Sequence, residues 1–239
     1  MFSLSEIDLN YGELKVLEQF SLDCRKQQFI ALYGPSGVGK TSILNLLSAI
    51  IKPQAGDVQA DFQRIAYVFQ EPRLIPWLSV RENLEIGLYN LELDAGERKK
   101  RVENLLPLLD LAEFGDYRPG QLSGGMKQRV SIGRAFIIQP DLLLLDEPFT
   151  GLDENLKNDM QELLISLEQW HRCTTVMVTH DVNEAIKLSD RIVVVQGRPC
   201  RIILDLYLQS DRRFTPDYAS QIRQSIRALA TLEETLEYA

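Results

Sequence analysis

Gly34-Pro35-Ser36-Gly37-Val38-Gly39-Lys40-Thr41 is the stretch that decides the fold, because it matches the phosphate-binding pattern G-x-x-x-x-G-K-[ST] at each defined position. The apolar run Phe29–Tyr33 leads into it, and apolar residues at helical spacing follow it from residue 41 to residue 51. The pattern requires a strand, a Gly-rich loop and a helix in this order. We therefore predict an α/β fold with a nucleotide site; the alternative is an ordinary Gly-rich turn.

The residues of this loop suit a polyphosphate. Glycines let the backbone curl so that successive N–H groups face the phosphates, and the N-terminus of the following helix adds a favourable dipole. Lys40 would bridge the phosphates, and the Thr41 hydroxyl would bind Mg²⁺. The residues predicted to contact nucleotide are Gly34, Pro35, Ser36, Gly37, Val38, Gly39, Lys40, Thr41 and Ser42.

Three further polar residues follow apolar strands. Leu142–Leu145 leads into Asp146 and Glu147, and Thr174–Thr179 leads into His180. Open α/β sheets place ligands at the carboxyl ends of their parallel strands. We predict that Asp146 holds Mg²⁺, that Glu147 is the general base for an attacking water, and that His180 contacts the γ-phosphate. The alternatives are a surface loop for the acids and a structural role for the histidine.

The composition argues against several classes of protein. The 239 residues carry a formal net charge of -8 and show no dense Lys/Arg stripe, so we expect no nucleic-acid partner. Three cysteines lie far apart without metal-ligand spacing, which predicts reduced thiols in a cytosol. The most apolar segments fall short of the roughly 20 residues that a membrane-spanning helix needs. Any membrane role is therefore expected to be indirect, through another protein.

Strands alternate with helices through most of the chain, which predicts a mostly parallel sheet with covered faces. Residues 1–33 alternate in the manner of strands, and the predicted fold includes a small antiparallel β region beside the parallel sheet. A capping box of Ser79 and Glu82 opens a charged, helical stretch. We predict one domain over 1–239, with a P-loop NTPase core at about 1–76 and 135–200, an inserted helical subdomain at about 77–134, and a C-terminal appendix at 201–239 with an amphipathic helix near 219–229.

Leu122-Ser123-Gly124-Gly125-Met126-Lys127-Gln128-Arg129 is similar to the signature of ABC transporter ATP-binding subunits, which ordinary P-loop proteins lack. The other motifs follow in that family's order, and the likeness covers nearly the whole chain. The resemblance implies the ABC ATPase fold, hydrolysis of ATP, and ATP with Mg²⁺ as cofactors.

The motifs of that family assign further residues. By resemblance, Tyr11 would stack on adenine, Gln70 would contact Mg²⁺ and the attacking water, and Asp153 would cross a dimer interface. Each has a plainer alternative, namely a core aromatic for Tyr11, a polar strand end for Gln70 and a helix N-cap for Asp153.

The resemblance also implies a composite site. Ser123 and the N–H groups of Gly124 and Gly125, at a helix N-terminus, would form an anion site that closes on ATP held by a second subunit. Gln128 of the same helix is assigned to this nucleotide site. The expected assembly is an ATP-dependent, head-to-tail homodimer.

A narrower likeness, to importer ATPases of the nitrate, sulfonate and taurine group, lies in Leu74-Ile75-Pro76-Trp77-Leu78. Phe149 and the pair Arg212-Arg213 fit the same group. The likeness implies uptake of a small solute through an integral membrane permease, with a periplasmic or surface solute-binding protein as an indirect partner. The chain would then be cytoplasmic and peripheral on the inner face of the cell membrane. Trp77 would help form an apolar groove for a short permease helix; the alternative is packing at the subdomain junction.

Three departures from the family are visible. The segment at residues 56–64 is short, which trims the peripheral β region. Gln27-Gln28 stands where the family usually has Gly-Glu, and Thr150-Gly151 replaces the commoner Ser-Ala, which alters the expected subunit contacts. Two other functions stay open: a soluble module that remodels nucleic acid or ribosomes, and a catalytically silent regulatory subunit. The short helical insert argues against the first, and the intact set of predicted catalytic residues argues against the second.

Overall fold

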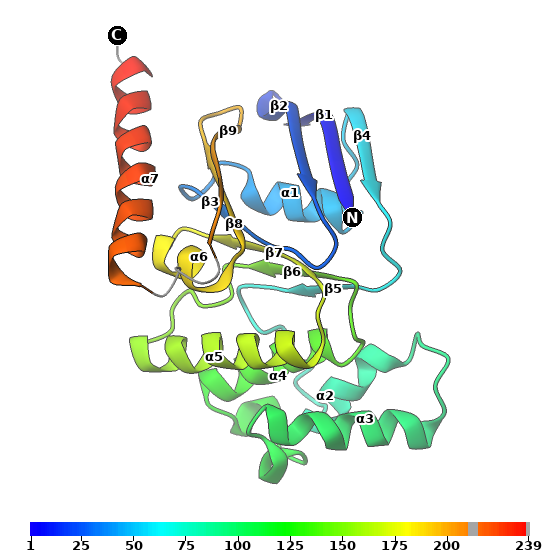
Figure 1. Ribbon diagram of the computed structural model, residues 1–239. Helices are drawn as coiled ribbons and strands as arrows, with labels where there is room; N and C mark the ends of the chain where they lie inside the picture. The colour runs from blue at the N-terminus through cyan, green and yellow to red at the C-terminus, as the bar shows by residue number, and fades with distance from the viewer. Residues whose placement is uncertain (210–214, 238–239) are drawn as a thin grey trace. The chain divides into compact units, whose positions relative to one another are not determined.

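The computed structural model describes residues 1–209 and 215–237, with side chains as far as residue 228 (Figure 1). These residues form two compact units, of which the first joins Met1–Asp61 to Thr174–Ala239 and the second is Phe62–Cys173. Parallel strands and helices occur in both units, and an antiparallel sheet occurs in the first, which confirms the predicted α/β class. The predicted limits of core, helical subdomain and appendix stay a prediction. The pair Arg212-Arg213 lies outside the described residues.

The first unit begins with an antiparallel sheet. The elements of this unit are, in chain order, β1 (Phe2–Tyr11), β2 (Leu14–Cys24), β3 (Phe29–Tyr33), α1 (Lys40–Leu47), β4 (Ala55–Ala60), β7 (Thr174–Thr179), α6 (Val182–Leu188), β8 (Arg191–Gln196), β9 (Arg201–Tyr207) and α7 (Pro216–Glu237). Strands β2, β1 and β4 are adjacent in that order. Phe2, Leu4, Ile7 and Leu9 of β1 are buried, and Gly12, with φ 61°, turns the chain into β2. The strand pattern predicted for residues 1–33 is therefore confirmed.

The parallel strands of the first unit position the phosphate loop. Strand β3 lies between β7 and β8 and is parallel to both, with Ala31 paired to Met177 and to Ile192. Their apolar runs are buried, as is typical of strands that are covered on both faces. Strand β9 pairs antiparallel with β8. The sequence pattern does not predict β9, because a register shift after Val194 breaks the alternation of a simple edge strand.

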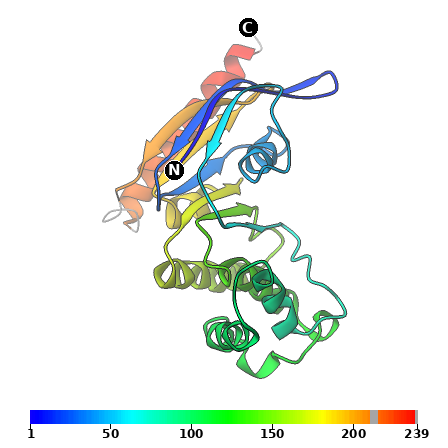
Figure 2. The ribbon, with the colours of Figure 1, turned by 90° about the vertical axis from the view of Figure 1, so that its right-hand side faces the viewer.

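Two helices of the first unit differ in length from the prediction. Helix α1 ends at Leu47, because Ala49 takes the left-handed φ of 57° and the Ile50 N–H donates to the Asn45 carbonyl at 3.0 Å. Ile50, which keeps the helical spacing, lies beyond the end of α1 and is 59% exposed, so the helix does not continue to residue 51. Helix α7 is longer than the predicted 219–229 and lies alongside α6 and β9 (Figures 1 and 2).

The turn before β3 has an unusual backbone. Gln27 takes a φ of 58°, in the left-handed region that favours glycine, and its N–H donates to the Thr174 hydroxyl at 3.0 Å. The chain thus makes a left-handed turn at the position where the resembled family usually has glycine.

The second unit combines a parallel strand pair with a group of helices. Its elements are β5 (Ile65–Val68), α2 (Val80–Glu85), α3 (Ala95–Leu108), α4 (Gly124–Phe136), β6 (Leu142–Asp146) and α5 (Glu154–Trp170), with short 3-10 helices at Ile86–Leu88, Ala112–Phe114 and Pro119–Gln121. Helix α4 packs against α2 and α5 (Figure 1). A methyl carbon added to Gly133 of α4 would lie 2.4 Å from the Leu109 side chain, so only glycine allows this close approach.

The predicted capping box opens α2. The Ser79 hydroxyl accepts the Glu82 N–H at 3.2 Å, and the Glu82 carboxylate accepts the Ser79 N–H at 2.7 Å. Within 1–209 and 215–237, no helix is both long and apolar enough to cross a lipid bilayer.

Candidate functional site

The predicted phosphate loop connects β3 to α1, as its sequence motif requires. Gly37 and Gly39 have φ values of 77° and 117°, which only glycine adopts without strain. A methyl carbon added to Gly34 would lie 2.2 Å from the Val195 carbonyl oxygen, so the loop starts in direct contact with β8. Residues 35–37 are exposed at the tip of the loop. The loop is therefore curled and open to an anion.

Lys40 holds this curled shape. Its side chain is buried, and its ammonium donates to the carbonyl oxygens of Gly34 and Pro35, both at 2.7 Å. A positive charge is thus fixed inside the loop, where a phosphate group would meet it. Thr41, the next residue of α1, is exposed and carries the hydroxyl that the sequence assigns to Mg²⁺.

Tyr11 lies beside the first turn of α1. It is the last residue of β1 and is 50% exposed, which excludes the alternative of a core aromatic. The Ser42 hydroxyl donates to the Tyr11 hydroxyl at 3.5 Å. An exposed ring at this position offers a face on which a nucleotide base can stack.

The register of β3 and β7 brings His180 to the same sheet edge as the phosphate loop. Tyr33 and Thr179 are paired across these strands, and Gly34 and His180 are the next residue of each chain segment. The turn that carries His180 is well fixed, because the Asp181 N–H donates to the Thr179 hydroxyl at 3.0 Å. The first unit therefore groups the loop, Tyr11 and His180.

Asp146 is the last residue of β6, and Gln70 follows β5, the strand with which β6 pairs in the second unit. Val68 of β5 is paired with Leu145 of β6, so the residues that follow this pair lie at one edge. The Tyr67 hydroxyl donates to Asp146 at 3.2 Å, and burial followed by the Asp146 charge raises the pKa of Tyr67. Tyr67 therefore stays protonated and orients the carboxylate. No sequence motif singles out Tyr67.

Glu147 sits on a strained backbone directly after β6. Its φ is 46°, a conformation that a non-glycine residue keeps only where the surroundings impose it. The Thr150 hydroxyl donates to the Glu147 carboxylate at 3.0 Å, and Gly151 turns the chain with a φ of 80°. Thr150-Gly151, a departure from the resembled family, thus holds the predicted general base in place.

The signature forms the N-terminus of α4. The Ser123 hydroxyl accepts the Met126 N–H at 3.2 Å, so Ser123 is the N-cap. Gly124 is exposed, and a methyl carbon added to it would have no neighbour within 4 Å. Gly125 is buried against Leu156. The exposed N-terminus is free to receive an anion, as the prediction requires.

Gln128 has a partner within the second unit. It is 3% exposed, and its side-chain amide donates to the Pro148 carbonyl at 2.7 Å. The bond ties the signature helix to the segment that follows Glu147. The nucleotide contact assigned to Gln128 stays a prediction.

Asp153 is the N-cap of α5. Its carboxylate accepts the Leu156 N–H at 3.0 Å, which confirms the helix-cap alternative. Because the Asp153 side chain is also exposed, the role at a dimer interface stays a prediction.

Trp77 lies on a loop that is held in place by hydrogen bonds to the side chain of Asn83. Trp77 is 70% exposed, which excludes the alternative of packing at a junction. Asn83, fully buried, accepts the Ile75 N–H at 2.8 Å and donates to the carbonyls of Ile75, Leu78 and Ser79. The tryptophan is therefore presented on a preformed surface.

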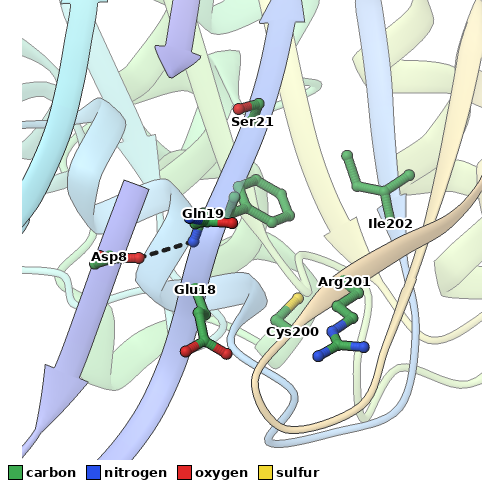
Figure 3. A pocket seen from close by; sticks show the side chains of 8 residues that line it. Asp8, Glu18, Gln19, Ser21, Cys200, Arg201 and Ile202 are labelled. Carbon is green, nitrogen blue, oxygen red and sulfur yellow. Dashed lines mark hydrogen bonds between the residues drawn. The ribbon is translucent and has the colours of Figure 1, made fainter. Parts of the chain in front are cut away.

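A cavity of about 630 Å³ lies in the first unit between β2 and the start of β9 (Figure 3). Asp8, Glu18, Cys200 and Arg201 are among the residues that line it. Burial raises the pKa of the Cys200 thiol to about 12, so the thiol is protonated at neutral pH. None of the residues predicted to bind nucleotide lines this cavity.

The comparison with known proteins agrees with the family that the sequence motifs resemble. The family described as ABC transporter matches residues 17–150. The bicarbonate transport ATP-binding protein CmpC of Synechocystis is 43% identical over 79% of this chain, and the aligned part is 30% of CmpC. The aliphatic sulfonates import ATP-binding protein SsuB 1 of Agrobacterium fabrum is 36% identical over 95% of this chain and 83% of its own length.

A solved structure shows the same fold. The ATP-binding cassette MJ0796, in a dimeric post-hydrolysis state bound to ADP and Pi, has a TM-score of 0.74 and 31% identity. The match covers 88% of this chain and all of that cassette.

Proposed function

The chain belongs to the ABC transporter family of ATP-binding, ATP-hydrolysing subunits, and on that premise we propose that it energises uptake of a small solute through a separate membrane permease. The two relatives named above are a bicarbonate transport and a sulfonate import protein, which supports a small solute that carries an anionic group. Taurine and nitrate are further candidates by the resemblance of Leu74–Leu78. The chain spans only 30% of the bicarbonate relative, so the transport function as a whole belongs to this proposal.

One observation carries the proposal: the same chain contains both a phosphate loop and a signature helix whose N-terminus is exposed. The loop supplies Lys40 and two left-handed glycines, and the signature supplies the capped, exposed N-terminus of α4. A loop alone suits any P-loop protein. A second anion site at a helix N-terminus is useful when it closes on a nucleotide held elsewhere.

The loop of the first unit would bind ATP. Its N–H groups and the Lys40 ammonium would hold the phosphates, the Tyr11 ring would stack on adenine, and His180 would contact the γ-phosphate. The pairing of Tyr33 with Thr179 supports the assignment of His180, because the loop and the histidine leave the same edge.

The acids of the second unit would perform hydrolysis. Glu147 would take a proton from the attacking water, with Thr150 fixing the carboxylate. Gln70 would orient the same water.

The residues present suit Mg²⁺, because Asp146, Gln70 and Thr41 offer the hard oxygen donors that this ion prefers. Asp146 ends β6 and Gln70 follows its partner β5, and Tyr67 orients the Asp146 carboxylate. When bound, Mg²⁺ would offset the charge of the phosphate oxygens.

The complete site would form in a homodimer. In a two-fold dimer, Ser123 and Gly124 of one subunit would meet the ATP on the loop of the other, and the reverse contact would be identical. Asp153, exposed at the start of α5, would lie in this interface. The dimeric MJ0796 structure is a precedent for such assembly in the family.

The permease would dock on the surface around Trp77. Leu74, Ile75 and Leu78 are neighbours of Trp77 in the sequence and are half-buried. Asn83 already holds this loop, so docking would cost little conformational entropy. An exposed aromatic residue on a rigid loop is a typical anchor for a partner helix. The chain would thus lie at the inner face of the membrane, held by the permease.

Hydrolysis and transport are tested with Glu147→Gln. We expect phosphate release and solute uptake in reconstituted vesicles both to fall by about 10²-fold or more, with ATP binding kept, because only the base is lost. Glu154→Gln, an exposed acid in the first turn of α5, is the matched control and keeps activity. Unchanged turnover in Glu147→Gln would overturn the base assignment. Purification without any integral membrane partner would overturn the transport role.

A further inference from the structure

The end of β8 and the turn that leads from it into β9 touch all three glycines of the phosphate loop. Methyl carbons added to Gly34, Gly37 and Gly39 would lie 2.2 Å from the Val195 carbonyl oxygen, 2.9 Å from Nη2 of Arg198 and 3.5 Å from Cβ of Cys200, respectively. At Gly37 the neighbour is a guanidinium. A cation therefore lies in contact with the exposed tip of the loop.

Arg198 has no visible partner in the protein. Its side chain is exposed, and within the described part of the chain no hydrogen bond or ion pair involves it. Other arginines differ: Arg191, for example, is held by Asp205 through two hydrogen bonds. The chain has a net charge of -8, yet the guanidinium of Arg198 is unpaired and lies beside an anion-binding loop. This position favours binding of a negatively charged ligand.

We propose that Arg198 is a second phosphate-binding cation, which acts with Lys40 on the polyphosphate chain of the nucleotide. The inference rests on the proposed role of the loop as the ATP site. Nη2 is 2.9 Å from the position of a Gly37 methyl carbon. A phosphate oxygen on the Gly37 N–H would be about 3 Å from that nitrogen, and therefore within about 8 Å of the guanidinium, which is less than a Debye length at 0.1 M salt.

The two cations have different surroundings. Lys40 is buried and already donates to two loop carbonyls, so it fixes the shape of the loop as well as its charge. Arg198 is exposed and reaches Gly37 from outside the loop. Its contribution should therefore grow with the charge of the nucleotide, and salt should screen it.

The test compares the affinities of ATP, ADP and AMP for the full-length chain, at low and at high salt. Arg198→Met keeps an apolar stem but removes the charge, and we expect it to weaken ATP binding about three- to tenfold at low salt, ADP less and AMP hardly at all. High salt should shrink the difference from wild type. Arg198→Lys should bind close to wild type.

Arg201→Met is the matched control, because Arg201 is exposed a few residues away on β9 and lines the cavity of Figure 3. We expect it to bind all three nucleotides as wild type does. Three results would overturn the inference: wild-type ATP affinity in Arg198→Met, an equal loss for all three nucleotides, or an equal effect of Arg201→Met.

Lys40→Met separates this inference from the proposed function. If Lys40→Met loses ATP and Arg198→Met does not, the loop is the nucleotide site and the role of Arg198 is refuted. If Lys40→Met binds ATP as wild type does, the proposed nucleotide site is itself refuted, and the inference with it.

Discussion

The bond from Gln128 to the Pro148 carbonyl links the signature helix to the segment that carries the general base, and it can be removed without creating a cavity. Gln128 is 3% exposed, and its amide donates at 2.7 Å. Leucine has nearly the same volume, so Gln128→Leu removes the donor and leaves the packing nearly unchanged.

The expected size of the effect follows from burial. A buried carbonyl that loses its donor costs about 1–3 kcal/mol, and we expect Gln128→Leu to lower the free energy of unfolding by about 2 kcal/mol. Because Pro148 is next to Glu147, kcat should also fall, by about tenfold, as the base becomes less well placed.

Gln128→Glu should show a dependence on pH. A carboxylate so close to a carbonyl oxygen is repelled, so its pKa is raised in the folded state. A raised folded pKa adds stability at low pH, and this stability is lost as the pH rises through the folded pKa. Gln128→Glu should therefore be less stable than Gln128→Leu at alkaline pH and should recover on acidification.

Urea unfolding followed by tryptophan fluorescence measures this directly, because both tryptophans, Trp77 and Trp170, lie in the second unit. Gln169→Leu, the same change at an exposed position of α5, is the control and should be nearly neutral. An unfolding free energy of Gln128→Leu within about 0.5 kcal/mol of wild type would refute the reasoning.

Three other perturbations have clear expected outcomes. Gln27→Gly should raise the melting temperature by about 1–2 °C, because relief of the left-handed backbone slightly exceeds the added freedom of the unfolded chain; calorimetry that shows a decrease would contradict this. Gly34→Ala should abolish ATP binding in a titration, since its methyl carbon would meet the Val195 carbonyl at 2.2 Å, whereas Gly120→Ala, with no neighbour within 4 Å, should bind normally. The Cys200 thiol, whose pKa burial raises to about 12, should resist a thiol reagent at pH 8 until the chain is unfolded, and rapid labelling of the native protein would show otherwise.

Local sequence patterns predict those parts of the molecule that depend on short-range chemistry. The loop motif predicts a strand, a curled loop and a helix, because only glycine supports the φ values of Gly37 and Gly39. The capping box at Ser79 depends on residues three apart and is confirmed. The exposure of Trp77 excludes the packing alternative, which the sequence alone leaves open.

Features that depend on long-range contacts are not predictable in the same way. Nothing in the sequence near Arg198 indicates that its guanidinium touches Gly37, because the two are far apart in the chain and meet through the pairing of β3 with β8. The orientation of Asp146 by Tyr67 likewise depends on the register of β5 and β6. The prediction of helix ends fails for a different reason. Ile50 keeps the helical spacing of apolar residues, but the left-handed backbone of Ala49 ends α1 before that position.

The composite site in a homodimer is the central claim, and mixing two inactive variants tests it most directly. Lys40→Ala removes the phosphate-loop cation and Ser123→Arg blocks the signature, so each chain alone should release almost no phosphate from ATP. In an equal mixture, half of the dimers pair one of each and contain one intact site out of two, so activity should return to about a quarter of wild type if the two sites act independently. A mixture that stays as inactive as the separate variants would contradict the account.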